Sequence, residues 1–88
     1  MSHAQTAAQW NSRGADAYEA GNWADAAEAF QKAYELDRRD NTIQHNLVNA
    51  VIMYAQDLSA SGNQEDAIEW LEYVISVDPE NVHPLNQL

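Results

Sequence analysis

Apolar residues recur along this chain at three- and four-residue steps, which is the spacing of one face of an α-helix. Short polar turns interrupt the pattern. It predicts four helices, over residues 3–20, 23–37, 42–60 and 64–77. The third segment is the most apolar, and we expect it to form the centre of the domain. Its apolar stripe consists of Ile43, Leu47, Val51, Tyr54 and Leu58.

The fourth predicted helix carries apolar residues on more than one side. Ala67 and Val74 mark one face, and further apolar side chains are distributed around the helix. A helix with this pattern is buried on more than one side. We expect residues 80–88 to begin another helix, which either folds back over Trp70 and Tyr73 or leaves them to a second chain. A third alternative is that the sequence was cut from a longer protein.

A ten-residue sequence motif, here called a phrase, occurs in two similar copies, at residues 21–30 and 62–71. Each copy opens with Gly-Asn and has Asp at its fifth position. Glycine adopts the left-handed conformation that ends a helix, and the Asn that follows is expected to cap the next helix. The phrase therefore predicts two turns between helices with the same design.

The residues around each copy also match in size. A small, a large and a small residue (Ala26, Phe30 and Ala33) recur 41 residues later as a set of similar sizes, and Trp10 and Gly14 extend the pattern upstream. Glycine inside a helix costs about 1 kcal/mol relative to alanine. Close approach of a neighbouring helix is the usual compensation, so we expect the second helix to cross the first at Gly14.

This order of Trp, Gly, small residue, Gly, Ala, Phe and Ala over residues 10–33 resembles the tetratricopeptide repeat, a helix-turn-helix unit of about 34 residues. The resemblance implies an all-α fold, with two antiparallel helix hairpins stacked in a right-handed superhelical array. A single domain then covers residues 1–88, with repeat one at about 7–40 and repeat two at about 41–81. A seven-residue insertion is expected to lengthen the third helix, and residues 82–88 form a short C-terminal helix.

The chain is strongly acidic, with 14 acidic and four basic residues and a formal net charge of −10. Such a charge repels the phosphates of nucleic acids and anionic lipids. We therefore expect protein or peptide partners with basic or apolar side chains, and neither nucleic acid nor membrane. The first residues lack the pattern of a signal peptide and no segment has the length of a membrane span, so we expect a cytoplasmic protein.

No catalytic or metal-binding pattern is present in the sequence. There is no cysteine, and no nucleophile with a base at a suitable spacing. His3, His45 and His83 are far apart, and none has a second His or Cys at helical spacing. We expect no enzymatic activity, no metal and no cofactor.

The resemblance implies that the first helix of each repeat lines a concave groove that takes a peptide. In repeat one this face contains Asn11, Ala15 and Tyr18. Asn side chains both donate and accept hydrogen bonds, and methionine adapts to apolar side chains, so this face is suited to an extended ligand. In repeat two the predicted groove residues are His45, Asn46, Asn49, Ile52, Met53 and Gln56.

The alternative is a structural role, in which the domain associates with itself as a homodimer or docks on a larger subunit. Its basis is an excess of apolar residues in the fourth helix and the C-terminal segment. A contiguous apolar patch on a monomer is usually an interface. The predicted interface residues are Trp70, Tyr73, Val77, Val82, Leu85 and Leu88.

Overall fold

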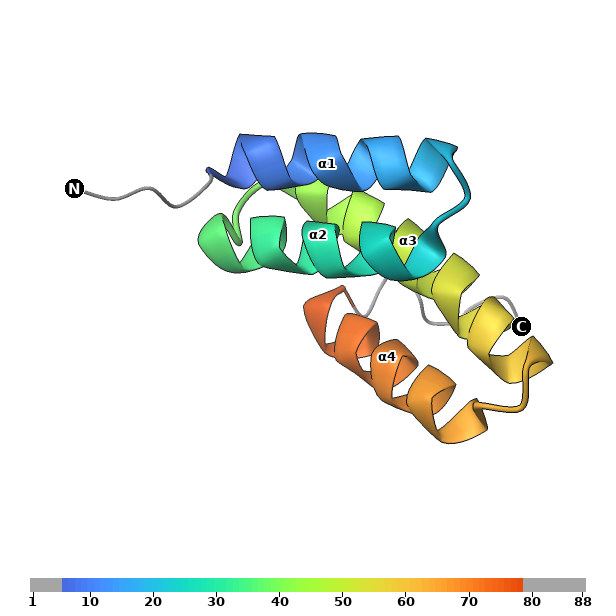
Figure 1. Cartoon of the computed structure of the whole chain (residues 1–88). Helices are drawn as coiled ribbons and strands as arrows, with labels where there is room; N and C mark the ends of the chain where they lie inside the picture. Colours follow the sequence, from blue (N-terminus) through green and yellow to red (C-terminus); the bar gives the residue numbers. More distant parts are fainter. Residues whose placement is uncertain (1–5, 79–88) are drawn as a thin grey trace, which may run out of the picture.

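The computed structural model describes residues 6–78, which form four α-helices joined by short turns (Figure 1). Successive helices run antiparallel and pack mainly on their neighbours in the sequence, and α1 also touches α3. The all-α fold with two helix hairpins is confirmed, whereas the superhelical stacking stays a prediction. The helices are α1 (Ala7–Glu19), α2 (Trp23–Leu36), α3 (Asn41–Ala60) and α4 (Gln64–Val77).

The first helix begins later than its pattern indicated. Thr6 has an extended backbone, so a helix that runs from residue 3 through this position is wrong. Thr6 Oγ1 accepts a hydrogen bond from the backbone N–H of Gln9 at 3.1 Å, and the side chain of Gln9 accepts one from the N–H of Thr6 at 2.9 Å. This reciprocal capping box satisfies two N–H groups that a helix start leaves without a partner, and it sets the beginning of α1.

Both Gly-Asn phrases form the same turn, as their repetition predicted. Gly21 has φ of 79° and Gly62 has φ of 89°, the left-handed conformation that glycine adopts without strain. In the first turn the N–H of Gly21 donates to the carbonyl of Tyr18 at 3.0 Å, and that of Asn22 donates to Ala17 at 2.9 Å. The second turn repeats both bonds. These paired bonds are a Schellman motif, which closes the end of the helix.

The two Asn residues occupy the predicted cap positions, but they do not cap with their side chains. Neither Asn22 nor Asn63 makes a side-chain capping hydrogen bond. Their backbone N–H groups instead donate hydrogen bonds to carbonyl oxygens of the preceding helix. The helix that is capped by a side chain in repeat two is α3, because Asp40 Oδ1 accepts from the N–H of Thr42 at 2.9 Å and of Ile43 at 3.1 Å.

The crossing of α1 and α2 lies at Gly14, as predicted. A Cβ atom at Gly14 would lie 2.6 Å from two ring carbons of Phe30, so the Phe30 ring, rather than the α2 backbone, occupies the space that glycine leaves. The rest of the buried surface of α2 is made of small side chains, which lets helices approach closely. These buried residues are Ala26, Ala27, Ala29 and Ala33.

The core lies around α3, which supplies half of the residues of the main cluster. Leu47, Val48 and Val51 of α3 are fully buried there, together with Phe30 of α2 and Val74 of α4. A second, smaller cluster joins the C-terminal half of α3 to α4. It consists of Ala55, Leu58 and Ala67, with Tyr54, Trp70 and Leu71 packed against it.

The third helix is elongated, as expected. It has 20 residues, against 13 in the equivalent helix α1, and the difference of seven equals the length of the predicted insertion. The C-terminal part of α3 extends past α1 and α2 and packs on α4 (Figure 1). The additional length therefore adds contact area to the second hairpin without breaking the helix.

We predict that Gly14→Ala destabilises the domain. The added methyl group would overlap the buried Phe30 ring, so the free energy of unfolding should fall by about 1–2 kcal/mol after the gain in helix propensity is counted. Urea unfolding followed by circular dichroism measures this change. Ser12→Ala at an exposed position of α1 is the matched control and should not destabilise. A Gly14→Ala variant more stable than the wild type would contradict the close contact.

Candidate peptide-binding groove

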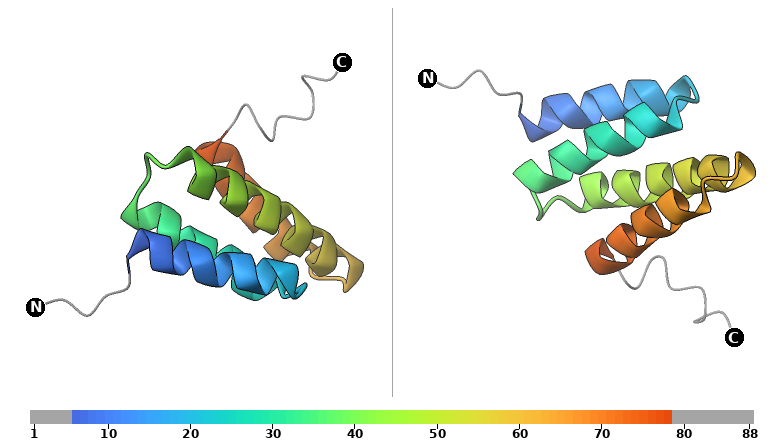
Figure 2. Two further views of the ribbon diagram at one scale, coloured as in Figure 1. Left: turned by 90° about the horizontal axis from the view of Figure 1, so that it is seen from above. Right: turned by 60° about the horizontal axis from the view of Figure 1, so that its bottom comes forward.

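A hollow lies where α1 and α3 run beside each other, on the side of the domain away from α4. Figure 2 (left) shows α1 and α3 toward the viewer, with much of α2 and α4 behind them. The hollow has a volume of about 190 Å³. It is therefore large enough for a single side chain or a short piece of backbone. Its lining residues are Ala15, Tyr18, Glu19, Phe30, Asn46 and Asn49.

Two of the predicted groove residues are joined by a hydrogen bond across the two repeats. The Nδ2 of Asn46 on α3 donates to Oδ1 of Asn11 on α1 at 3.0 Å. Both side chains are partly buried at this contact. Among residues 6–78 neither Nδ2 of Asn11 nor Oδ1 of Asn46 makes a hydrogen bond, so the NH₂ group of Asn11 and the amide oxygen of Asn46 are available to a ligand.

The groove has an aromatic wall and an aromatic floor. Tyr18 is half-buried, and its ring packs edge-on against that of Trp23 with centroids 5.0 Å apart. Phe30 forms part of the lining although the sequence assigned it only to the core. No signal in the sequence identifies Phe30 as a groove residue, because its place in the apolar pattern is that of a core residue. Glu19 is an exposed acid at the same rim.

The structure does not bring all of the predicted groove residues together. Asn49 is exposed and lines the hollow, whereas exposed His45 and half-buried Met53 do not. Ile52 and Gln56 line a separate groove between α3 and α4. The predicted set is therefore divided between two surfaces, because α3 is long enough to contribute to both.

The predicted interface residues of α4 that the structure describes are half-buried within the chain. Trp70, Tyr73 and Val77 pack against the main core cluster. The Trp70 ring lies edge-on to the ring of Tyr54, with centroids 5.6 Å apart, and the carbonyl of Val77 accepts from Nε2 of Gln44 at 2.9 Å. These contacts hold α4 on α3. The other interface predictions, Val82, Leu85 and Leu88, lie outside the described residues.

Tyr73 has an unusual environment between α2 and α4. Burial raises the pKa of its hydroxyl above the ordinary 10.0, and the charge of Glu35 raises it further, while the nearby side chain of Gln31 lowers it. The hydroxyl oxygen is buried and makes no hydrogen bond of good geometry with any of residues 6–78. Gln31 lies nearby but does not form such a bond. A buried polar group without a partner reduces stability.

In the part of the chain that the structure describes, no group of three His, Asp or Glu side chains could hold a metal ion. Two of the histidines, His3 and His83, lie outside this part. None of the described helices combines the length and the apolar character that a membrane crossing requires.

We predict that Tyr73→Phe leaves the domain at least as stable at neutral pH and makes it more resistant to alkali. The raised pKa means that the folded state holds the Tyr73 proton more tightly than the unfolded state does. Stability is therefore lost as pH rises above 10.0, and the variant lacks this loss. Thermal melts at pH 7 and above pH 10 measure the effect, with Tyr54→Phe as the control. Parallel alkaline losses in wild type and Tyr73→Phe would contradict it.

A comparison with known protein families finds a match to the tetratricopeptide repeat over residues 5–80. No curated protein and no solved structure gave a significant match. The matched segment contains both Gly-Asn turns and all four helices, and covers most of the 88 residues. The chain therefore belongs to the tetratricopeptide repeat family, which supports a general role as a protein–protein interaction module.

Proposed function

We propose that this domain binds a short extended segment of a partner protein in the groove between α1 and α3. The observation that supports it most is the meeting of Asn11, Asn46 and Asn49 beside one hollow. Each amide carries a donor and an acceptor, as does each peptide unit of an extended chain. Three amides along two adjacent helices therefore match the backbone of such a ligand.

The rings at the groove favour an apolar side chain of the ligand. Tyr18 and Phe30 contribute aromatic carbon to the lining, and Ala15 leaves room beside them. Burial of an apolar side chain against such a surface contributes about 25 cal/mol per Å² of apolar area. The hollow of about 190 Å³ limits this anchor to one side chain, so we propose an affinity in the micromolar range for a short peptide.

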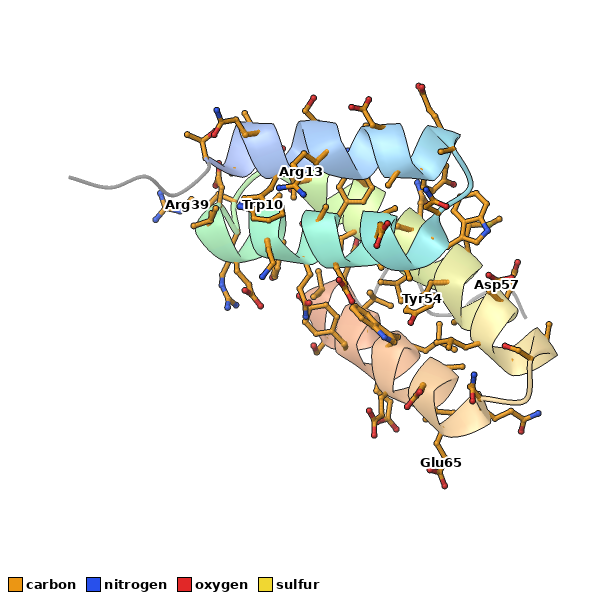
Figure 3. All side chains as sticks on the ribbon, in the orientation of Figure 1. Trp10, Arg13, Arg39, Tyr54, Asp57 and Glu65 are labelled. Carbon is orange, nitrogen blue, oxygen red and sulfur yellow. The ribbon has the colours of Figure 1, made fainter. Side chains whose placement is uncertain are left out.

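Charge favours a ligand that is basic next to this anchor. Glu19 is the only charged residue of the lining. The basic side chains Arg13 and Lys32 stack on the Trp10 ring instead, with distances of 4.6 and 5.5 Å to its centroid, and Figure 3 shows Trp10 and Arg13 together between α1 and α2. A Lys or Arg of the ligand beside Glu19 therefore meets an unopposed negative charge at the groove.

Self-association through α4 is the second candidate function. The observation in its favour is that Ile68 and Ile75 on α4 are 53% and 45% exposed. Trp70, Tyr73 and Val77 contribute less to such a contact, because they already pack within the chain. The groove between α1 and α3 is complete in one chain, so binding there does not require a dimer.

We predict that the chain is a monomer. Light scattering on a size-exclusion column should give a mass near 9.9 kDa at low and at high salt, because the groove needs no second copy. High salt screens the repulsion between the acidic chains, so a dimer that repulsion prevents at low salt would form at high salt. A mass twice this value at either salt concentration would favour self-association instead.

We predict that Asn49→Ala weakens peptide binding by about fivefold to tenfold, the effect of losing one to two hydrogen bonds at an exposed site. The peptides would be selected from a random display library on the full chain, and their affinities measured by fluorescence anisotropy. Asn22→Ala is the matched control, since this Asn is also exposed and its side chain makes no capping bond. Equal affinities of both variants and the wild type would reject the groove.

A further inference from the structure

A second groove lies between α3 and α4, the last two helices that the structure describes. It has a volume of about 480 Å³, larger than the hollow between α1 and α3. Its walls are mainly apolar, and its most exposed member is Ile68, at 53%. We refer to it as the end groove. Its lining residues are Ile52, Ala55, Gln56, Ser59, Gln64, Ala67, Ile68 and Leu71.

The shape of the end groove suits an α-helix. Its two walls are the antiparallel helices α3 and α4, which lie side by side in Figure 2 (right). Ile68 and Leu71 on α4 are three residues apart, and Ile52 and Ala55 on α3 are also three apart. This spacing forms the ridges and grooves against which helices pack.

The opposite end of the stack has a different surface. The solvent-facing positions of α1 include Gln9, Ser12 and Asp16, which are polar and exposed. In repeat proteins, the terminal helices usually have polar outer faces, which prevent association at both ends. A groove between α1 and α2 at that end contains charged side chains as well as Trp10, whereas no charged residue lines the end groove. A second copy could not cover the end groove with this face without burying charged groups. The charged residues of the groove between α1 and α2 are Arg13, Asp25, Glu28 and Lys32.

The charge around the end groove is negative throughout. The first 39 residues hold all four basic residues and six of the 14 acidic ones, which leaves eight acidic and no basic residues from Asp40 onward. Glu65 and Glu72 lie one turn on either side of Ile68 and are exposed, and Figure 3 shows Glu65 pointing out from α4. Two copies meeting through this same face would bring equal charges together, whereas a basic partner would be attracted.

From these observations we infer that the end groove binds a basic amphipathic helix of a partner protein. The apolar row of that helix packs between Ile52 and Ile68, and its Lys or Arg residues lie beside Glu65 and Glu72. This surface is separate from the groove between α1 and α3, so the inference does not depend on peptide binding there.

The test uses the full chain and a synthetic fluorescein-labelled helical peptide. The peptide has 14 residues, the length of α4, with leucine at positions i, i+3, i+4 and i+7 and lysine elsewhere. Ile68→Gln should weaken its binding about tenfold, because an exposed apolar contact is lost. Leu36→Gln is the matched control and should have no effect, since Leu36 is 54% exposed but lies on α2.

A second pair of variants tests the role of charge. Glu65→Gln with Glu72→Gln should weaken binding several-fold more than Asp25→Asn with Glu28→Gln, which removes the same charge from exposed positions of α2. A peptide of identical composition with its leucines scattered should bind at least about tenfold more weakly, since it has no apolar row.

Several results would overturn the inference. Equal binding of the scattered peptide, or equal effects of Ile68→Gln and Leu36→Gln, would mean that only general charge attraction acts. Peptide binding that appears only when Val82, Leu85 and Leu88 are changed to serine would assign the groove to the C-terminal segment. A doubled mass without peptide that returns to 9.9 kDa in Ile68→Gln would assign it to a second copy.

Discussion

The close packing of α2 between its neighbours is the contact on which the rest of the structure depends. Four of the five buried residues of α2 are alanines, and its one large buried side chain, Phe30, lies on Gly14 of α1. Small residues on α2 let α1 and α3 approach it from two sides. This approach places α1 and α3 close enough for Asn11 and Asn46 to bond at 3.0 Å. The groove between the repeats is thus a consequence of the packing of α2.

The same packing explains why the two surfaces of the domain differ in character. The surface between α1 and α3 lies within the stack, where amides and rings from two repeats meet. The end groove lies between α3 and α4, the last two described helices, and its apolar residue Ile68 is exposed. A repeat architecture produces both kinds of surface, because each hairpin buries its apolar face only against a neighbour.

Much of the fold could be predicted because its determinants are local. The helical spacing of apolar residues predicted the four helices, and the glycines predicted the two turns. The distance between the two phrases predicted that α3 is longer than α1. The capping pattern was not predictable, because Asn22 and Asp40 are both suitable cap residues and only backbone geometry decides which side chain is used.

The site was less predictable because it depends on contacts between repeats. Helical spacing placed Asn46 and Ile52 on one broad face of α3, but in the structure Asn46 lines the hollow beside α1 and Ile52 lines the groove beside α4. Spacing also placed Trp70 among the apolar residues of α4 without showing that Tyr54 lies against it. Such divisions follow from where neighbouring helices cross, which a single helix pattern does not contain.

Amide chemical-shift mapping by NMR tests the proposed binding groove most directly. The full chain, labelled with ¹⁵N, would be titrated with an unlabelled peptide selected on it from a random display library. We expect the largest shifts at the side-chain amides of Asn11, Asn46 and Asn49 and at the backbone around Tyr18. Saturating shifts confined to α4, with these asparagine signals unmoved, would contradict binding between α1 and α3.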